Sequence, residues 1–218
     1  MYAISPDGGT PERLASSEAG QNPLPWSMSP DGETLLIVDA VTTNEVNIGT
    51  LNVAQDKSVK PLLDHVSEPA VSPHGAWLLS EVLPNPTSAT PASVEIDIRP
   101  FPDVRQQRRP VGNGYHPMFS SDGSEIFAFD GEGLTAAPVQ YDPLRVGAQR
   151  KLFRGQYWWG VAGPTGALGR AWDVDPKNDR FLMITLPQTV GSDGAIAQPQ
   201  VTVVLNWFDE LRQRVPKR

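Results

Sequence analysis

Short apolar runs alternate with polar turns along the chain, and one arrangement of the two recurs four times. The turn MSPDG at 28–32 is followed two residues later by the apolar run LLIV, and the same order returns at 71–75 (VSPHG), 119–123 (FSSDG) and 174–178 (VDPKN). In each turn Ser or Asp bonds its own backbone, and Gly or Asn takes the position of positive φ. Each turn is therefore predicted to join two antiparallel strands.

The spacing of these turns is typical of propeller blades. The Gly or Asn positions 32, 75, 123 and 178 are separated by 43, 48 and 55 residues, and four-stranded blades repeat at about 40 to 50 residues. A repeat must bury equivalent residues alike, so the first residues of the apolar runs are predicted to match: Leu35, Leu78, Ile126 and Phe181. We predict an all-β fold, a β-propeller or propeller fragment of about four blades of four-stranded antiparallel sheets.

A second pair of extended segments follows in each of the first three units, at 46–63, 94–111 and 134–153, whereas the fourth unit has a third segment, QVTVVLN, and no clear fourth. The opening residues have the same shape, so the SPDG at 5–8 is assigned to an outer hairpin and not to an inner turn. The predicted propeller covers residues 1–206, with outer strands of an incomplete blade at 1–21 and repeat units at 22–64, 65–111, 112–155 and 156–206. Residues 207–218 are predicted to form a short helical tail, because Phe208, Leu211 and Val215 share one helical face.

Composition and charge exclude several classes of protein. The 218 residues include 22 Pro, 19 Gly and no Cys, which favours short β elements and removes disulfides and thiolate metal sites. No apolar run approaches the roughly 18 residues of a membrane helix, so we expect no membrane insertion of this segment. The net charge is −7, and an acidic chain argues against nucleic acid as a partner.

Catalytic and metal-binding motifs are weak in this sequence. No G-x-S-x-G elbow occurs, and His65, His74 and His116 form no close ligand pair. A propeller gathers equivalent positions at its axis, so a metal pair of His65 and His116 is an alternative to polar residues near turns. Asp31, Asp122 and Asp175 are interpreted as turn residues before cation ligands. We expect no catalytic residue, no cofactor and no metal.

One aromatic cluster stands beside a glycine-rich stretch, at Tyr157, Trp158 and Trp159. Aromatic side chains next to a flexible loop can stack on a sugar or grip a peptide, although packing between blades uses the same residues. We predict a ligand site on one face of the propeller that contains these three residues with His116 and Arg170. Trp26 and Trp172 precede their turns at equivalent positions and are assigned to blade packing.

At these residues the chain resembles a known family. The SPDG turns with outer hairpins of the form YAISPDGGTPERL resemble those of TolB-type β-propellers, relatives of the WD-type repeats. The closing stretches GRAWDVDPKNDRFLMITLP and QVTVVLNWFDELRQRVP are similar to the C-terminal end of propellers attached to bacterial serine/threonine protein kinases. The resemblance implies a kinase domain and a membrane helix upstream, a six- or seven-bladed propeller, and an extracytoplasmic (periplasmic) location. The kinase signatures HRD and DFG are not in this sequence.

We therefore expect a non-enzymatic binding or sensing module that recognises a protein, a small molecule or a glycan, as the C-terminal part of a larger signalling protein. The alternative is a propeller hydrolase or lyase, which should bring at least one histidine and two carboxylates to the axis. A third interpretation is a truncated gene product without its native task. Open blade edges favour a homodimer over a ring closed by pairing of the N-terminal segment with Val201 to Leu205.

Overall fold

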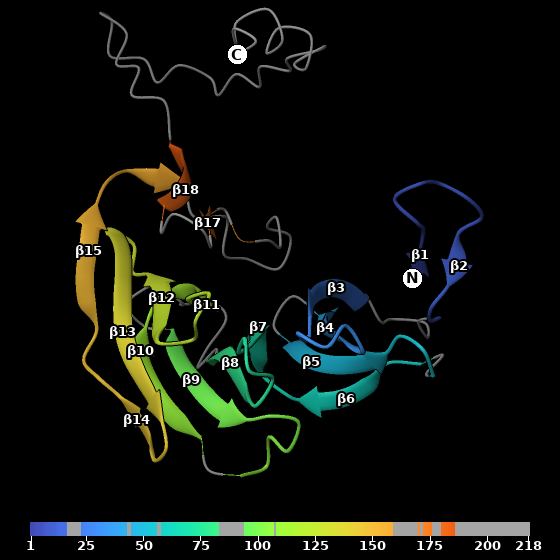
Figure 1. Ribbon diagram of the computed structural model, residues 1–218, viewed down its shortest axis with the longest axis horizontal. Coiled ribbons are helices and arrows are strands. Elements are labelled where there is room, and N and C mark those ends of the chain that lie inside the picture. Colours follow the sequence, from blue (N-terminus) through green and yellow to red (C-terminus); the bar gives the residue numbers. More distant parts are fainter. Residues whose placement is uncertain are drawn as a thin grey trace, which may run out of the picture. The chain divides into compact units, whose positions relative to one another are not determined.

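The computed structural model describes residues 1–16, 23–42, 45–55, 58–82, 94–106, 108–158, 170, 172–175 and 180–185. Residues 1 to 184 belong to one compact unit. All regular elements within the described residues are β-strands (Figure 1), which confirms the all-β prediction. No helix in this part of the chain has the length and apolar character needed to span a membrane.

Four antiparallel sheets follow one another along the chain as the blades of a four-bladed β-propeller arrangement (Figure 1). Blade 1 contains β3 (Pro23–Met28), β4 (Thr34–Thr42), β5 (Glu45–Asn52) and β6 (Lys60–Leu63). Blade 2 contains β7 (Val66–Val71), β8 (Trp77–Val82), β9 (Glu95–Pro100) and β10 (Arg109–Asn113). In both sheets the strands pair in chain order.

Blades 3 and 4 depart slightly from this simple order. Blade 3 contains β11 (Tyr115–Phe119), β12 (Glu125–Phe129), β13 (Gly133–Tyr141), β14 (Leu144–Val146) and β15 (Arg150–Arg154). Both β14 and β15 pair with β13, at different parts of that long strand. Blade 4 contains β16 (Tyr157–Trp158), β17 (Trp172–Asp175) and β18 (Arg180–Thr185), with β18 in the middle.

The inner turns join their strands in one common register. The first residue of each turn motif pairs with the first residue of the apolar run after it. The pairs are Met28 with Leu35, Val71 with Leu78, Phe119 with Ile126, and Val174 with Phe181. The predicted repeat alignment is therefore confirmed in its register, although the four apolar residues are not buried equally. Leu78 and Ile126 are fully buried, whereas Leu35 and Phe181 are partly buried. The fourth turn itself, at 176–179, lies outside the described residues.

Apolar side chains cover both faces of the inner strands, because successive residues of a strand point to opposite faces. In β8, Leu78 and Leu79 are both fully buried. Leu78 packs with Leu36 of blade 1, whereas Leu79 belongs to a cluster shared with blade 3. Phe127 of blade 3 packs in the same way with Trp172 of blade 4, which confirms a packing role for Trp172. The hydrophobic cores therefore lie between successive blades.

The N-terminal residues form a separate hairpin of β1 (Tyr2–Ala3) and β2 (Glu12–Arg13). Its turn is closed by the Gly8 N–H, which donates to the Ser5 carbonyl at 2.9 Å, so the first SPDG lies in a hairpin turn; its assignment to the outer strands of a blade stays a prediction. Met1 and Leu14 pack with the buried cluster of Ala15, Ile37 and Leu51. The segment Val201 to Leu205 and the tail 207–218 lie outside the described residues, so their pairing and helicity stay predictions.

Candidate functional site

The innermost strands of blades 2 and 3 carry an unusual backbone feature at the same repeat position. Glu68 lies three residues before Val71, and His116 lies three residues before Phe119. Both precede a proline and both have positive φ, 54° for Glu68 and 55° for His116. The pairing register of β7 and of β11 shifts at these residues. Residues before proline favour extended backbone, so the surrounding structure holds both positions in a costly conformation.

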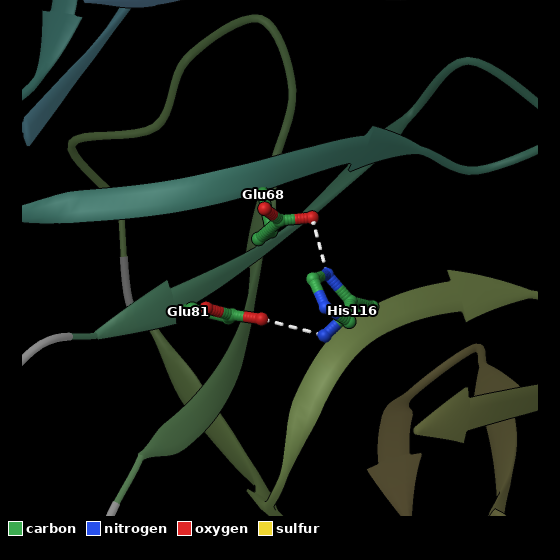
Figure 2. Close-up of side chains that lie close together, drawn as sticks. All are labelled: Glu68, Glu81 and His116. Atoms are coloured by element: carbon green, nitrogen blue, oxygen red, sulfur yellow. Dashed lines mark hydrogen bonds and ion pairs between the residues drawn. The ribbon is translucent and has the colours of Figure 1, made fainter. Parts of the chain in front are cut away.

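This backbone places Glu68 and His116 next to Glu81 of β8 (Figure 2), and we call the three residues the inner-strand cluster. The Nδ1 atom of His116 lies 2.9 Å from Oε2 of Glu68. The backbone N–H of His116 donates to Oε1 of Glu81 at 2.5 Å, and the Ser67 hydroxyl donates to its Oε2 at 3.1 Å. Strands of two blades therefore build the cluster together.

Burial dominates the electrostatics of the inner-strand cluster. Only 7% of Glu68, 3% of Glu81 and 9% of His116 is exposed to solvent. Burial, and then the neighbouring Glu68 carboxylate, raise the pKa of Glu81 to about 8, although His116 acts in the opposite direction. Burial and the Glu81 charge also raise the pKa of Tyr115 to about 12. Glu81 therefore binds a proton more readily than an exposed glutamate does.

Arg170, which the sequence analysis assigned to the ligand site, lies next to blade 3. Its Nη1 atom is 3.0 Å from the sulfur of Met118. Burial lowers the pKa of Arg170, while the charges of Glu68 and Asp173 act to raise it. Arg170 also borders an open pocket of about 430 Å³, which is lined by Met118, Arg170, Trp172, Asp173, Leu182 and Ile184. A partly buried guanidinium therefore lies at the edge of a partly apolar pocket.

The predicted aromatic residues are only partly described. Tyr157 and Trp158 form β16 and are half-buried. The Tyr157 ring packs edge-on against the Phe153 ring, with centroids 5.8 Å apart. Trp159 and the glycine-rich stretch at 160–169 lie outside the described residues. Blade packing accounts for the described contact of Tyr157, and the ligand role of the three aromatics stays a prediction.

The remaining candidates of the sequence analysis have local roles. His65 is exposed and is not part of the inner-strand cluster, so the alternative metal pair with His116 finds no support among the described residues. The His74 ring meets the Tyr141 ring edge-on at a centroid distance of 5.9 Å. Asp31 and Asp122 accept the hydroxyls of Ser29 and Ser120 within their turns, as expected for turn residues.

Sequence reasoning missed the two glutamates of the inner-strand cluster. A signal for Glu68 was present, because Glu68 and His116 both precede a proline at the same repeat position. Glu81 pairs with Ser67 across blade 2, whereas Phe129 pairs with Tyr115 at the matching place in blade 3. The repeat therefore predicts an apolar residue at position 81, and no local sequence pattern predicts a buried carboxylate there.

Comparison with known proteins supports the fold. No protein-family model matches the sequence, and no curated protein matches it. TolB from Acinetobacter baumannii is similar in structure, with a TM-score of 0.58 at 13% identity over 86% of this chain and 43% of that protein. A protein assigned as TolB from Agrobacterium tumefaciens gives a TM-score of 0.53 at 17% identity, over 75% of this chain and 59% of that one. The fold is that of a TolB-type β-propeller.

This chain corresponds to only part of the length of the two TolB structures. This chain spans 43% and 59% of the lengths of the two TolB structures. A gluconolactonase from Xanthomonas campestris is also matched, with a TM-score of 0.46 at 17% identity over 76% of this chain and 63% of that enzyme. Likeness at these identities concerns the fold, and one fold carries many functions.

Proposed function

We propose that this chain is a non-enzymatic binding module whose ligand site lies at the inner strands of blades 2 to 4. The observation that carries the proposal is the meeting of charged side chains from neighbouring blades. Glu68 and His116 are in contact, and the charge of Glu68 acts on the partly buried guanidinium of Arg170. Positions of strained backbone cluster at ligand sites, which is consistent with the conformations of Glu68 and His116.

The pocket beside Arg170 favours recognition of a small polar molecule with an apolar part. Leu182 and Ile184 are 74% and 50% exposed and form part of its wall. Asp173 and Arg170 supply one carboxylate and one guanidinium at the same pocket. Ligand sites are mostly apolar with a few placed polar groups that fix orientation. A carboxylate-bearing ligand, such as a sugar acid, an amino acid or the end of a peptide, fits this chemistry.

A thermal-shift experiment tests this proposal with defined probes. The full chain is heated with single sugar acids, amino acids and dipeptides, each at a concentration far above that needed for binding. A ligand at about 100 times its Kd stabilises the folded state by about 2.7 kcal/mol, which raises the Tm of a chain of this size by roughly 5 to 11 °C. Arg170→Ala should weaken the effective probe by at least about tenfold.

Arg154→Ala is the matched control, because Arg154 is a cation at the end of β15, its side chain is 74% exposed, and it does not line the pocket. It should leave the thermal shift unchanged. The proposal fails if no probe in the panel raises the Tm, or if Arg170→Ala binds the effective probe as tightly as the wild type.

A second candidate is a propeller hydrolase or lyase, because the inner-strand cluster brings one imidazole and two carboxylates together. An imidazole whose Nδ1 is held by a carboxylate is the usual arrangement of a general base. Turnover of an ester, lactone or uronide that is abolished by His116→Asn and preserved in His65→Asn would support this candidate. Turnover that is equal in the two variants would exclude it.

The cellular setting belongs to the same proposal. We place the module in the extracytoplasmic, C-terminal part of a larger signalling protein because the closing stretches resemble kinase-attached propellers. Fusion of the natural full-length protein to a reporter active only outside the cytoplasm tests this placement. Reporter activity is expected, and a cytoplasmic signal alone would contradict it.

A further inference from the structure

The inner-strand cluster brings imidazole and carboxylate ligand atoms of three buried side chains close together (Figure 2). One ligand atom from each of Glu68, Glu81 and His116 lies within 4.8 Å of the others. Zn²⁺ binds nitrogen and oxygen at about 2.0 to 2.2 Å, so a tetrahedral ion holds its ligand atoms roughly 3.4 Å apart. Metal binding would therefore require the three side chains to rotate so that their ligand atoms move from within 4.8 Å to this spacing. We infer that these residues bind one divalent transition-metal ion.

Charge balance supports a cation in this space. Two ionised carboxylates and a neutral imidazole carry a charge of −2, which a divalent ion neutralises within the cluster, whereas Arg170 interacts with Glu68 from outside it. Without a cation, two neighbouring carboxylates with little access to water repel each other and lose the hydration that stabilises their charges. The three side chains are each at least nine-tenths buried, so water screens their charges poorly.

The ligand types select the class of ion. Mg²⁺ and Ca²⁺ prefer six or more oxygen ligands, whereas imidazole with carboxylate suits Zn²⁺ and its first-row neighbours. Three protein ligands leave a coordination position for an outside molecule. The inference deepens the proposed binding function and rests on it for the location of the site: the ion would take up the acidic part of a ligand at the inner strands.

Zinc titration of the full chain tests the inference directly. The protein is prepared without a polyhistidine tag, treated with a chelator, and titrated with Zn²⁺ in a calorimeter. We expect about one equivalent to bind, and affinity to fall by at least about tenfold in Glu68→Gln and in His116→Asn. Asparagine tolerates positive φ, so His116→Asn removes the imidazole without adding backbone strain.

His65→Asn is the matched control, because His65 also has positive φ, at 56°, but is exposed and outside the cluster. It should bind Zn²⁺ as the wild type does. Absence of binding to the wild type, or equal affinity in His116→Asn, would overturn the inference.

A measurement on the wild-type protein tests zinc binding by His116 even if the variants do not fold. The sequence has three histidines, so imidazole NMR signals can be followed individually during zinc addition. The His116 signal should shift with one equivalent, while those of His65 and His74 stay in place; an unmoved His116 signal would also overturn the inference. If Zn²⁺ does not bind, the Arg170-dependent thermal shifts with organic probes are unaffected. The metal inference and the proposed binding function can therefore be rejected separately.

Discussion

The imidazole Nδ1 of His116 lies 2.9 Å from the Glu68 carboxylate, although the two residues are 48 positions apart in the sequence. They occupy the same place in successive repeat units, three residues before the inner turn. Packing of blade 3 against blade 2 therefore brings equivalent positions together. A propeller uses its repeat in this way to build a site from residues that never meet within one blade.

Leucines of the blades should contribute to stability according to how deeply they are buried. Leu78 is fully buried between blades 1 and 2. Leu78→Ala should lower the free energy of unfolding by about 2 to 5 kcal/mol, because it leaves a cavity. Leu182→Ala is the control, since Leu182 is 74% exposed, and it should cost less than about 0.5 kcal/mol. Urea denaturation measures both, and equal losses would contradict the assigned packing.

The glycine of the inner turn is required for its backbone angle and not for lack of space. Gly75 has φ of +74°, and a Cβ added to it would meet nothing within 4 Å. Gly75→Val should destabilise by roughly 1 to 2 kcal/mol, whereas Gly75→Asn should cost clearly less, because Asn adopts positive φ readily. The sequence uses Asn178 at the matching position of the fourth turn. Thermal unfolding compares the two variants, and equal costs would refute the argument.

A buried ion pair holds the outer half of blade 2. Asp97 is fully buried and accepts hydrogen bonds from Ser80 Oγ at 2.6 Å and from Arg99 Nη2 at 2.8 Å. Arg99→Ala leaves this carboxylate with fewer donors, so we expect a loss of about 3 kcal/mol in unfolding free energy. Arg105→Ala, at an exposed site of the same blade, should change it by less than about 0.5 kcal/mol. A loss below 1 kcal/mol for Arg99→Ala would show that the remaining donors suffice.

The acid sensitivity of the inner turns should depend on their serines. Hydrogen bonds from Ser120 and Ser124 lower the pKa of Asp122 from 3.8 to about 2. A lowered carboxyl pKa stabilises the fold above the unfolded value, and this contribution is lost as the pH falls from about 3.8 to about 2. Ser120→Ala should raise the Asp122 pKa toward 3.8, as measured by NMR titration.

Blade 2 supplies the comparison for this titration, since His74 stands where the first and third turns have Asp. Its turn is closed by the same backbone bond, from the Gly75 N–H to the Ser72 carbonyl at 2.8 Å. Ser72→Ala should therefore leave the Asp122 titration unchanged. An Asp122 pKa that stays near 2 in Ser120→Ala would locate the cause of the shift elsewhere.

The sequence by itself determined the blades, because the forces that make them are local. A Ser-Pro-Asp-Gly turn closes within five residues, and the contiguous apolar run that follows it marks a strand buried on both faces. For this reason the register that pairs Val71 with Leu78 and Phe119 with Ile126 could be predicted from spacing alone. The turn roles of Asp31 and Asp122 follow from the same local chemistry.

Only the tertiary structure decided which side chains share the inner-strand cluster. Glu81 sits in β8 where the repeat predicts an apolar residue, and its neighbours Glu68 and His116 reach it through a register shift in two different strands. No sequence period encodes such a shift, because it depends on how neighbouring sheets pack. Once buried together, the three side chains lose water and interact strongly, which turns ordinary glutamates and a histidine into a candidate site.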